Sequence, residues 1–158
     1  DFVTKNNTIF KLNKTLEQAR KDGKTIIFVN LGFAQDYSDH PQHSPVLGAA
    51  AANGILKQGT PSTELHPDIR TKPSDLFITK TRVSGFSSPE LVETLQNHNI
   101  THLEIAGFAT NLAVESTVRA AHDLDFTVTV RGDLSGATTQ KIHEASLLSM
   151  QPFAEIIS

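Results

Sequence analysis

The stretch AGFATNLAVESTVRAAHDL, residues 106–124, predicts a tight connection between a buried strand and a helix. An apolar run from His102 to Ala106 ends at Gly107, and an amphipathic pattern begins after a short turn. Open α/β sheets bind their ligands outside the carboxyl ends of the strands, where the first N–H groups of the next helix point at the ligand. We therefore expect the functional site at this connection, residues 106–114, which we call the elbow.

The rest of the chain alternates helical and strand patterns around the elbow. Ile9, Leu12, Leu16 and Ala19 recur at helical spacing before Gly23, and TIIFVNL has the β-branched density of a fully buried parallel strand. The chain predicts helices over residues 7–21, 89–98 and 139–150, and strands over residues 25–31, 75–80, 102–106, 126–130 and 155–157. Between residues 32 and 75 no clear element is expected, which is typical of a binding loop.

Composition limits the class of protein. A chain of 158 residues is long enough for a single domain, residues 1–158, with its own core. The net charge of −3, with scattered lysines and arginines, argues against nucleic acid as a partner, and no apolar run has the length of a membrane span. Because the chain has no cysteine, disulfides and thiolate metal sites are excluded, and a cytoplasmic location is the default expectation.

The elbow and two further blocks carry a resemblance to a known family. The run G-F-A-T-N-x-x-V-E-S-T-x-R-x-A resembles the signature of the isochorismatase-like, or cysteine hydrolase, superfamily, and ITKTRVSGFSSPEL and VRGDLSGATTQKIHEASL resemble its flanking blocks. The resemblance implies an α/β fold of three layers, with a mostly parallel Rossmann-like sheet of order 3-2-1-4-5-6 and helices on both faces. It places family positions on Lys80, Asp133 and His143; we interpret the last two as scaffold.

The resemblance also implies a set of site residues. Lys80 is expected to be the catalytic or substrate-polarising cation, and the N–H groups of Ala109 and Ala113 are expected to meet an oxyanion. Ala113 occupies the position of the nucleophilic cysteine in most of the family. The family's unusual cis peptide falls between Phe108 and Ala109. The substrate pocket is expected to include Phe86, Phe108 and Thr110.

Three explanations of Ala113 stay open. The first, which we place ahead, is a hydrolase that protonates its small carboxylate or carbonyl-bearing substrate and needs no thiol. The second is a cysteine amidohydrolase of the nicotinamidase, maleamate or N-carbamoyl type whose nucleophile was replaced by alanine. The third is a catalytically inactive homologue that binds a small molecule. A methyl group is compatible with general-acid chemistry but not with an acyl-enzyme.

The resemblance places one further catalytic group before residue 1. Asp1, Phe2 and Val3 look like the tail of the family's opening motif, so the first strand and its catalytic Asp are expected upstream of Asp1. Asp1 is a poor candidate for the acid, because the family's second Asp lies beyond the catalytic one.

Partners and metals are less well defined by the residues. Asp36, Asp39, His40 and His43 invite a metal site, but their spacing favours solvated loop side chains, so we expect no metal and no cofactor. Residues 49–52, an alanine run, predict a short helix that packs against a loop or another subunit. From the resemblance we expect a homodimer or homotetramer.

Near the elbow, several side chains have structural interpretations. Thr110 and Asn111 are expected to cap the helix, and Glu115 and Arg119, four residues apart, to form an ion pair, with a partner-facing Arg119 as the alternative. The buried stripe of this helix is expected to contain Thr117, Val118, Ala121 and Leu124.

Overall fold

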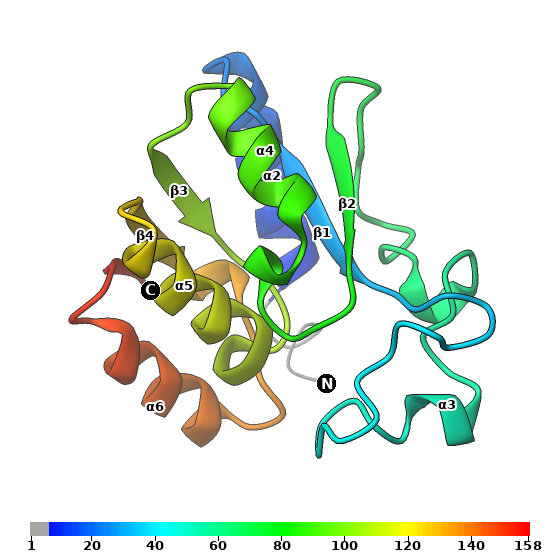
Figure 1. The fold of residues 1–158 in the computed structure, drawn as a ribbon. Helices are drawn as coiled ribbons and strands as arrows, with labels where there is room; N and C mark the ends of the chain where they lie inside the picture. Colours follow the sequence, from blue (N-terminus) through cyan, green and yellow to red (C-terminus); the bar gives the residue numbers. More distant parts are fainter. Residues whose placement is uncertain (1–6) are drawn as a thin grey trace.

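The computed structural model of the protein describes residues 7–158, an alternation of parallel strands and helices (Figure 1). The strands are β1 (Ile27–Leu31), β2 (Leu76–Lys80), β3 (His102–Ile105), β4 (Thr127–Arg131) and β5 (Glu155–Ile157). The helices are α2 (Thr8–Lys21), α3 (Ala50–Asn53), α4 (Pro89–Asn97), α5 (Glu115–Asp123) and α6 (Gln140–Met150). No helix within residues 7–158 is long and apolar enough to cross a bilayer.

Local sequence signals explain most of the helix ends. Gly23 follows α2 with φ +72° and donates its N–H to the Arg20 carbonyl, as expected of a glycine that ends a helix. Pro89 occupies the first turn of α4, and the Thr139 hydroxyl accepts the Ile142 N–H at the start of α6. Ser88 stands at the cap position of α4 but makes no capping bond with its side chain.

The strands form two parallel sheets, which corrects the expected six-stranded sheet. β1 pairs with β2, from Ile27 opposite Leu76 to Leu31 opposite Lys80, and the second sheet has the order β3-β4-β5. Within residues 7–158 no strand pairs with both β1 and β3 to join the two sheets.

Burial follows from this division. Each residue of β1 is only half-buried, so the expectation of a fully buried strand is wrong, because β1 is hydrogen-bonded to a neighbouring strand on one edge. A core nevertheless spans both sheets: Phe86, Leu103 and Phe126 pack against Ile78 and Leu95 beside the first sheet, and also against the cluster around Val118 and Val130 beside the second. Burial of this apolar surface holds the two sheets together.

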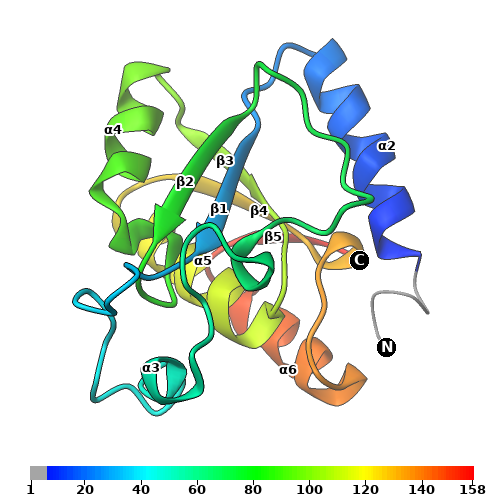
Figure 2. The ribbon, with the colours of Figure 1, turned by 90° about the vertical axis from the view of Figure 1, so that its right-hand side faces the viewer.

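Helices cover both sides of the β1–β2 pair. α4 lies on one side and α2 on the other (Figure 2). α5 packs on the second sheet through Val118 and Ala121, next to Met150 of α6. Leu124, expected in the same stripe, is 50% exposed, because α5 ends at Asp123 and the chain turns there.

Residues 32–75 form the long loop, which contains α3 and one short 3-10 turn at Pro61–Thr63. Phe33 is completely buried and, with Leu47 and Ala50, gives this loop a small core of its own. The alanine run therefore packs within its own loop. At the end of the loop, the buried Asp75 accepts two hydrogen bonds from Arg20 on α2, the shorter of 2.6 Å.

Candidate active site

The elbow is held by backbone hydrogen bonds to the segment that follows β4. Gly107 adopts φ +153°, which favours glycine, and the peptide bond between Phe108 and Ala109 is cis, at the position that the resemblance gives. The Thr110 N–H donates to the Gly136 carbonyl at 2.7 Å, and the Gly136 N–H donates to the Gly107 carbonyl at 3.2 Å. A π-helical turn, Thr110–Val114, then leads into α5.

Thr110 turns its side chain away from the helix start. Its hydroxyl is fully buried and forms a 2.8 Å hydrogen bond with Nδ1 of His143 on α6, so it caps nothing, contrary to expectation. Burial lowers the pKa of His143, which favours the neutral ring. The scaffold interpretation of His143 and the pocket assignment of Thr110 stay predictions, but this bond commits the Thr110 hydroxyl to the protein interior.

Ala113, at the nucleophile position, is half-buried within the π-helical turn. Its carbonyl accepts a 2.6 Å hydrogen bond from Thr117 Oγ1. Neighbouring N–H groups of the turn, those of Leu112 and Val114, donate to the Ala109 carbonyl. Phe108 and Gly136 form an isolated parallel bridge, so the backbone around Ala109 is held against the segment that follows β4. The oxyanion role of the Ala109 and Ala113 N–H groups stays a prediction.

Lys80 ends β2 and is 6% exposed. Its ammonium donates to the Val83 carbonyl, and no carboxylate of residues 7–158 lies within ion-pair distance of its Nζ. Burial lowers the pKa of Lys80 to about 8. A cation of this kind is suited to hold a substrate anion or to donate a proton near neutral pH.

The segment after Lys80 returns to the elbow. The Gly85 N–H donates to Thr117 Oγ1 at 2.8 Å, which joins this segment to α5. Phe86, expected to line the pocket, packs at a ring-centroid distance of 5.7 Å from Phe126 between the two core clusters. Phe108, in contrast, is 59% exposed at the elbow. Their assignment to a pocket stays a prediction.

Asp133 lies in a charged network. Arg131 donates two hydrogen bonds to Asp133 and one to Glu104, and Glu104 also pairs with Lys24. The bond from Arg131 holds the pKa of Asp133 below its usual range. A fully engaged carboxylate of this kind agrees with the scaffold interpretation.

Three of the four candidate metal ligands of the long loop are bonded within the loop itself. Asp39 accepts the Ala34 N–H, Asp36 accepts from Ser38, and the His40 ring bonds the Tyr37 carbonyl at 2.7 Å. Within residues 7–158 no group of three histidine, aspartate or glutamate side chains is placed to hold a metal ion.

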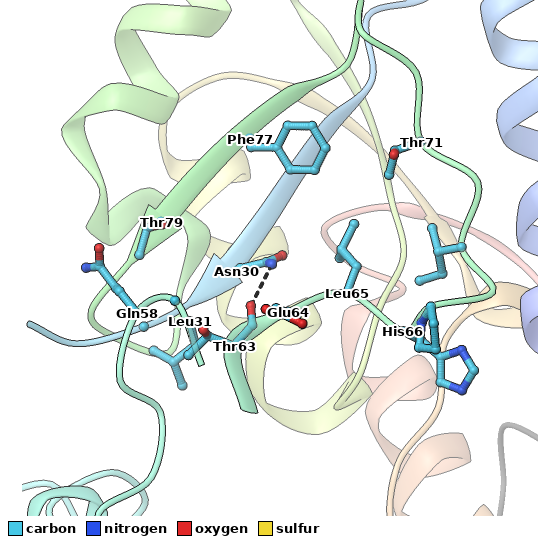
Figure 3. A pocket seen from close by; sticks show the side chains of 14 residues that line it. Asn30, Leu31, Gln58, Thr63, Glu64, Leu65, His66, Thr71, Phe77 and Thr79 are labelled. Carbon is cyan, nitrogen blue, oxygen red and sulfur yellow. Dashed lines mark hydrogen bonds between the residues drawn. The ribbon is translucent and has the colours of Figure 1, made fainter. Parts of the chain in front are cut away.

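A cavity of about 490 Å³ lies on the face of the β1–β2 pair opposite to the buried Lys80 side chain (Figure 3). Asn30, Phe77 and Thr79 line it from the strands, and the Asn30 amide donates to the Thr63 carbonyl of the long loop. Because successive side chains of a strand point to opposite faces, Thr79 lines this cavity whereas Lys80 is buried on the other side. The cavity is therefore separate from Lys80.

The predicted ion pair on α5 is confirmed. Arg119 donates to Glu115 at 2.8 Å, and the hydroxyls of Ser146 and Ser149 on α6 also donate to Glu115. The Arg119 guanidinium lies 4.6 Å from the centroid of the Phe153 ring of the same chain. Arg119 thus joins α5 to the C-terminal segment.

Two roles were missed by sequence reasoning. Thr117, expected only as part of a buried stripe, uses its hydroxyl to bridge two segments, and Gly136 closes the elbow from the far side. A small hydroxyl four residues after Ala113 is the only signal for the first. Asp1, the poor candidate for the acid, lies outside the described residues.

Known proteins are similar to this chain in sequence. The model of the Isochorismatase domain family matches residues 2–158. Ureidoacrylate amidohydrolase RutB of Variovorax paradoxus is 31% identical over 162 residues, 92% of this chain and 63% of that protein. The enzyme of the same name from Caulobacter vibrioides is 31% identical over 156 residues, 90% of this chain and 69% of that protein. The chain thus spans less than two thirds of the Variovorax protein.

Solved structures agree in fold. An isochorismatase family protein from Desulfovibrio vulgaris superposes with a TM-score of 0.86 at 22% identity, over 95% of this chain and 79% of that chain. A cysteine hydrolase from Pseudomonas syringae pv. phaseolicola superposes with a TM-score of 0.84 at 21% identity, over 96% of this chain and 74% of that chain. Because the Isochorismatase domain model matches residues 2–158, the chain belongs to the isochorismatase family.

Proposed function

We propose that the protein is a hydrolase of a small carboxylate- or carbonyl-bearing metabolite, that its site lies between Lys80 and the elbow, and that it works without a thiol. The observation that carries the proposal is the buried ammonium of Lys80. Lys80 ends β2, and the segment that follows it is hydrogen-bonded to Thr117 of α5, which also bonds the Ala113 carbonyl. A buried cation without a carboxylate partner in residues 7–158 is costly, and an anionic substrate would provide the missing charge.

The chemistry follows from the groups at the site. With a pKa of about 8, Lys80 is mostly protonated at pH 7 and can neutralise a carboxylate or donate a proton to the leaving group. In this proposal the N–H groups of Ala109 and Ala113 on the elbow would meet negative charge that develops on a carbonyl oxygen. Because Ala113 carries no nucleophile, water must attack the substrate directly.

A second candidate function is amide hydrolysis. Relatives at 31% identity are named ureidoacrylate amidohydrolase, and an amidohydrolase that uses a cysteine would have lost it at Ala113. The two candidates differ in their response to Ala113→Cys: a new or greatly increased hydrolysis of ureidoacrylate or another small amide would favour the second, and no change would favour the first.

The direct test compares Lys80→Ala with Lys141→Ala, an exposed lysine on α6. Hydrolysis of isochorismate, ureidoacrylate and small amides is measured for each variant. We expect Lys80→Ala to lower kcat/KM by about 100-fold or more, as loss of a charged transition-state contact does, and Lys141→Ala to have no effect. Equal turnover in the two variants would contradict the proposal. Saturable binding without turnover, weakened by Lys80→Ala, would identify a binding protein instead.

For assembly we propose a homodimer or homotetramer, as the resemblance implies. Large exposed side chains, Phe10 at 72% and Leu148 at 67%, support the proposal, because an interface would remove them from water. Light scattering coupled to size exclusion tests it, and a monomer at all concentrations would contradict it.

A further inference from the structure

Thr117 joins the two segments that make up the proposed site. It lies in α5, and its hydroxyl donates to the Ala113 carbonyl at 2.6 Å while accepting the Gly85 N–H at 2.8 Å. The first bond reaches the elbow, and the second reaches the segment that follows Lys80. One hydroxyl group thus contacts both sides.

Helix geometry explains only one of the two bonds. A threonine in a helix often donates to the carbonyl four residues earlier, so the bond to Ala113 alone would be ordinary. The bond from Gly85 spans 32 residues of sequence, and its backbone donor is part-buried. This second bond fixes the segment after β2 to α5, which helix geometry does not require.

Gly85 allows the close approach. A Cβ atom at this position would lie 3.3 Å from both Thr117 Oγ1 and Thr117 Cγ2, and 3.3 Å from Leu91 Cδ2. Those contacts are tighter than side chains ordinarily make. The absence of a side chain at residue 85 therefore sets how near the segment comes to α5.

The same segment holds Lys80. The Lys80 ammonium donates to the Val83 carbonyl, two residues before Gly85, and Ser84 is bonded within the turn through its hydroxyl and its carbonyl. The Lys80 segment, residues 81–87, is therefore hydrogen-bonded to the Lys80 ammonium at Val83 and to α5 at Gly85. Movement of this segment would move the ammonium relative to Ala113.

We infer that Thr117 is a positioning residue, which fixes the Lys80 segment against the elbow and so sets the placement of the Lys80 ammonium relative to residue 113. The inference rests on the proposed function, because it takes Lys80 and residue 113 to be parts of one site. In this inference Thr117 acts through the Lys80 segment and not by contact with the substrate. Its hydroxyl, and not its methyl group, carries the effect.

The experiment uses the absence of cysteine from the chain. Ala113→Cys introduces a single thiol at the elbow, and its rate of alkylation by iodoacetamide is followed against pH. In this background we compare Thr117→Val, Thr117→Ser and Lys80→Met, with Ser116→Ala as a control on the same helix. A nearby ammonium lowers the pKa of a thiol, so the rate near pH 7 reports the distance between the two groups.

We expect Thr117→Val to slow alkylation at pH 7 by about threefold to tenfold and to raise the pKa of the thiol, because the ammonium is no longer held near it. Thr117→Ser keeps the hydroxyl and should stay within about twofold of the parent, as should Ser116→Ala. An unchanged rate in Thr117→Val would overturn the inference. If Lys80→Met slows alkylation in that case, the proposed site survives; if it also has no effect, the proposed function fails as well.

A measurement on the unaltered protein covers the case in which Thr117→Val does not fold. The Gly85 amide proton should exchange at least about 100-fold more slowly than in an unstructured chain, because it is bonded to Thr117 Oγ1. Exchange at the unprotected rate would overturn the inference. Gly85→Ala, which pushes the segment away from α5, should slow the alkylation as Thr117→Val does, and an unchanged rate would contradict the inference.

Discussion

The elbow and the long loop both depart from regular secondary structure, but they are held in different ways. The elbow is bonded to elements distant in sequence: Thr110 to His143 on α6 and to Gly136, and Ala113 to Thr117, which itself reaches Gly85. The interior of the long loop is closed mainly by its own residues, as in the bond from His40 to the Tyr37 carbonyl.

The elbow and the long loop differ in how firmly their residues must be held for their tasks. Groups that must act together need fixed positions, and the elbow obtains them from buried bonds to several elements. The long loop is fixed at its end by Asp75 through Arg20 and has single bonds to other elements within it, such as that from Arg82 to the Asp39 carbonyl. Because most of its other bonds are local, we expect its interior to tolerate substitution better than the elbow. We expect substitutions in the two regions to follow this division.

The largest expected effect concerns the anchor of the long loop. The Asp75 side chain is 1% exposed and accepts from Arg20 and from the Lys72 N–H, so Asp75→Asn should lower the free energy of unfolding by about 3 kcal/mol at pH 7. The exposed Asp68 is the control, and Asp68→Asn should change the free energy by less than about 0.5 kcal/mol. Urea denaturation measures both. Equal effects would show that Asp75 is not an anchor.

The same carboxylate gives a pH dependence. Burial favours a higher pKa for Asp75, but the bonds from Arg20 and Lys72 outweigh it and hold the pKa below its usual value of 3.8. A lowered pKa means that the stabilisation is complete above about pH 4 and is lost as the pH falls through the folded-state pKa. The difference between the protein and Asp75→Asn should shrink on acidification.

The second-largest expected effect on the free energy of unfolding is at Lys80, where a substitution should stabilise the protein. Because burial penalises the charged ammonium, Lys80→Met should raise the free energy of unfolding at pH 7 by roughly 2 kcal/mol. Between pH 8 and pH 10.5 the unfolded chain binds this proton and the folded protein does not, so the stability of the unaltered protein should rise toward that of the variant. Denaturation at pH 7 and pH 9.5 tests this, and a destabilised Lys80→Met would contradict it.

The elbow bond comes third. Thr110→Val keeps the shape but removes the buried bond to His143, which should cost about 1–2 kcal/mol of unfolding free energy. Thr138→Val, at an exposed site, is the control and should be nearly neutral. A neutral Thr110→Val would mean that this bond does not hold the elbow.

The smallest effect is expected inside the long loop. His40→Leu removes a bond that spans three residues, and its cost should be below about 1 kcal/mol because the loop core around Phe33 remains. Thermal unfolding alongside Thr110→Val gives the comparison. A larger loss for His40→Leu than for Thr110→Val would break the division between the two regions.

Periodicity predicted the secondary structure well because it is a local property. The helices and strands with predicted bounds are present, with boundaries within two residues. The helix after the elbow, expected to be capped by Thr110 and Asn111, begins later, at Glu115, after a π-helical turn. The joining of strands into sheets is not local: β1 reads as a buried strand from TIIFVNL, yet its burial depends on what pairs with its second edge.

Prediction of the site has the same limit, because contacts between distant segments cannot be read from local sequence. The identity of the elbow and the end position of Lys80 follow from motif and pattern, as does the Glu115–Arg119 pair, which helix spacing fixes. The direction in which a hydroxyl group points does not follow from motif or pattern. Thr110 reads as a cap but turns inward to His143, and Thr117 reads as a stripe residue but reaches Gly85, because in each case the partner comes from a distant segment.

The most direct test of the central claim, that Lys80 acts as a protonated group at the elbow, is the pH dependence of kcat/KM for a hydrolysed substrate. With a pKa of about 8, Lys80 should be active below that pH, and kcat/KM should fall about tenfold for each further pH unit as the ammonium is lost. Lys80→Arg, which stays charged, should remove this fall. A constant kcat/KM from pH 7 to pH 9.5 in the unaltered protein would contradict the account.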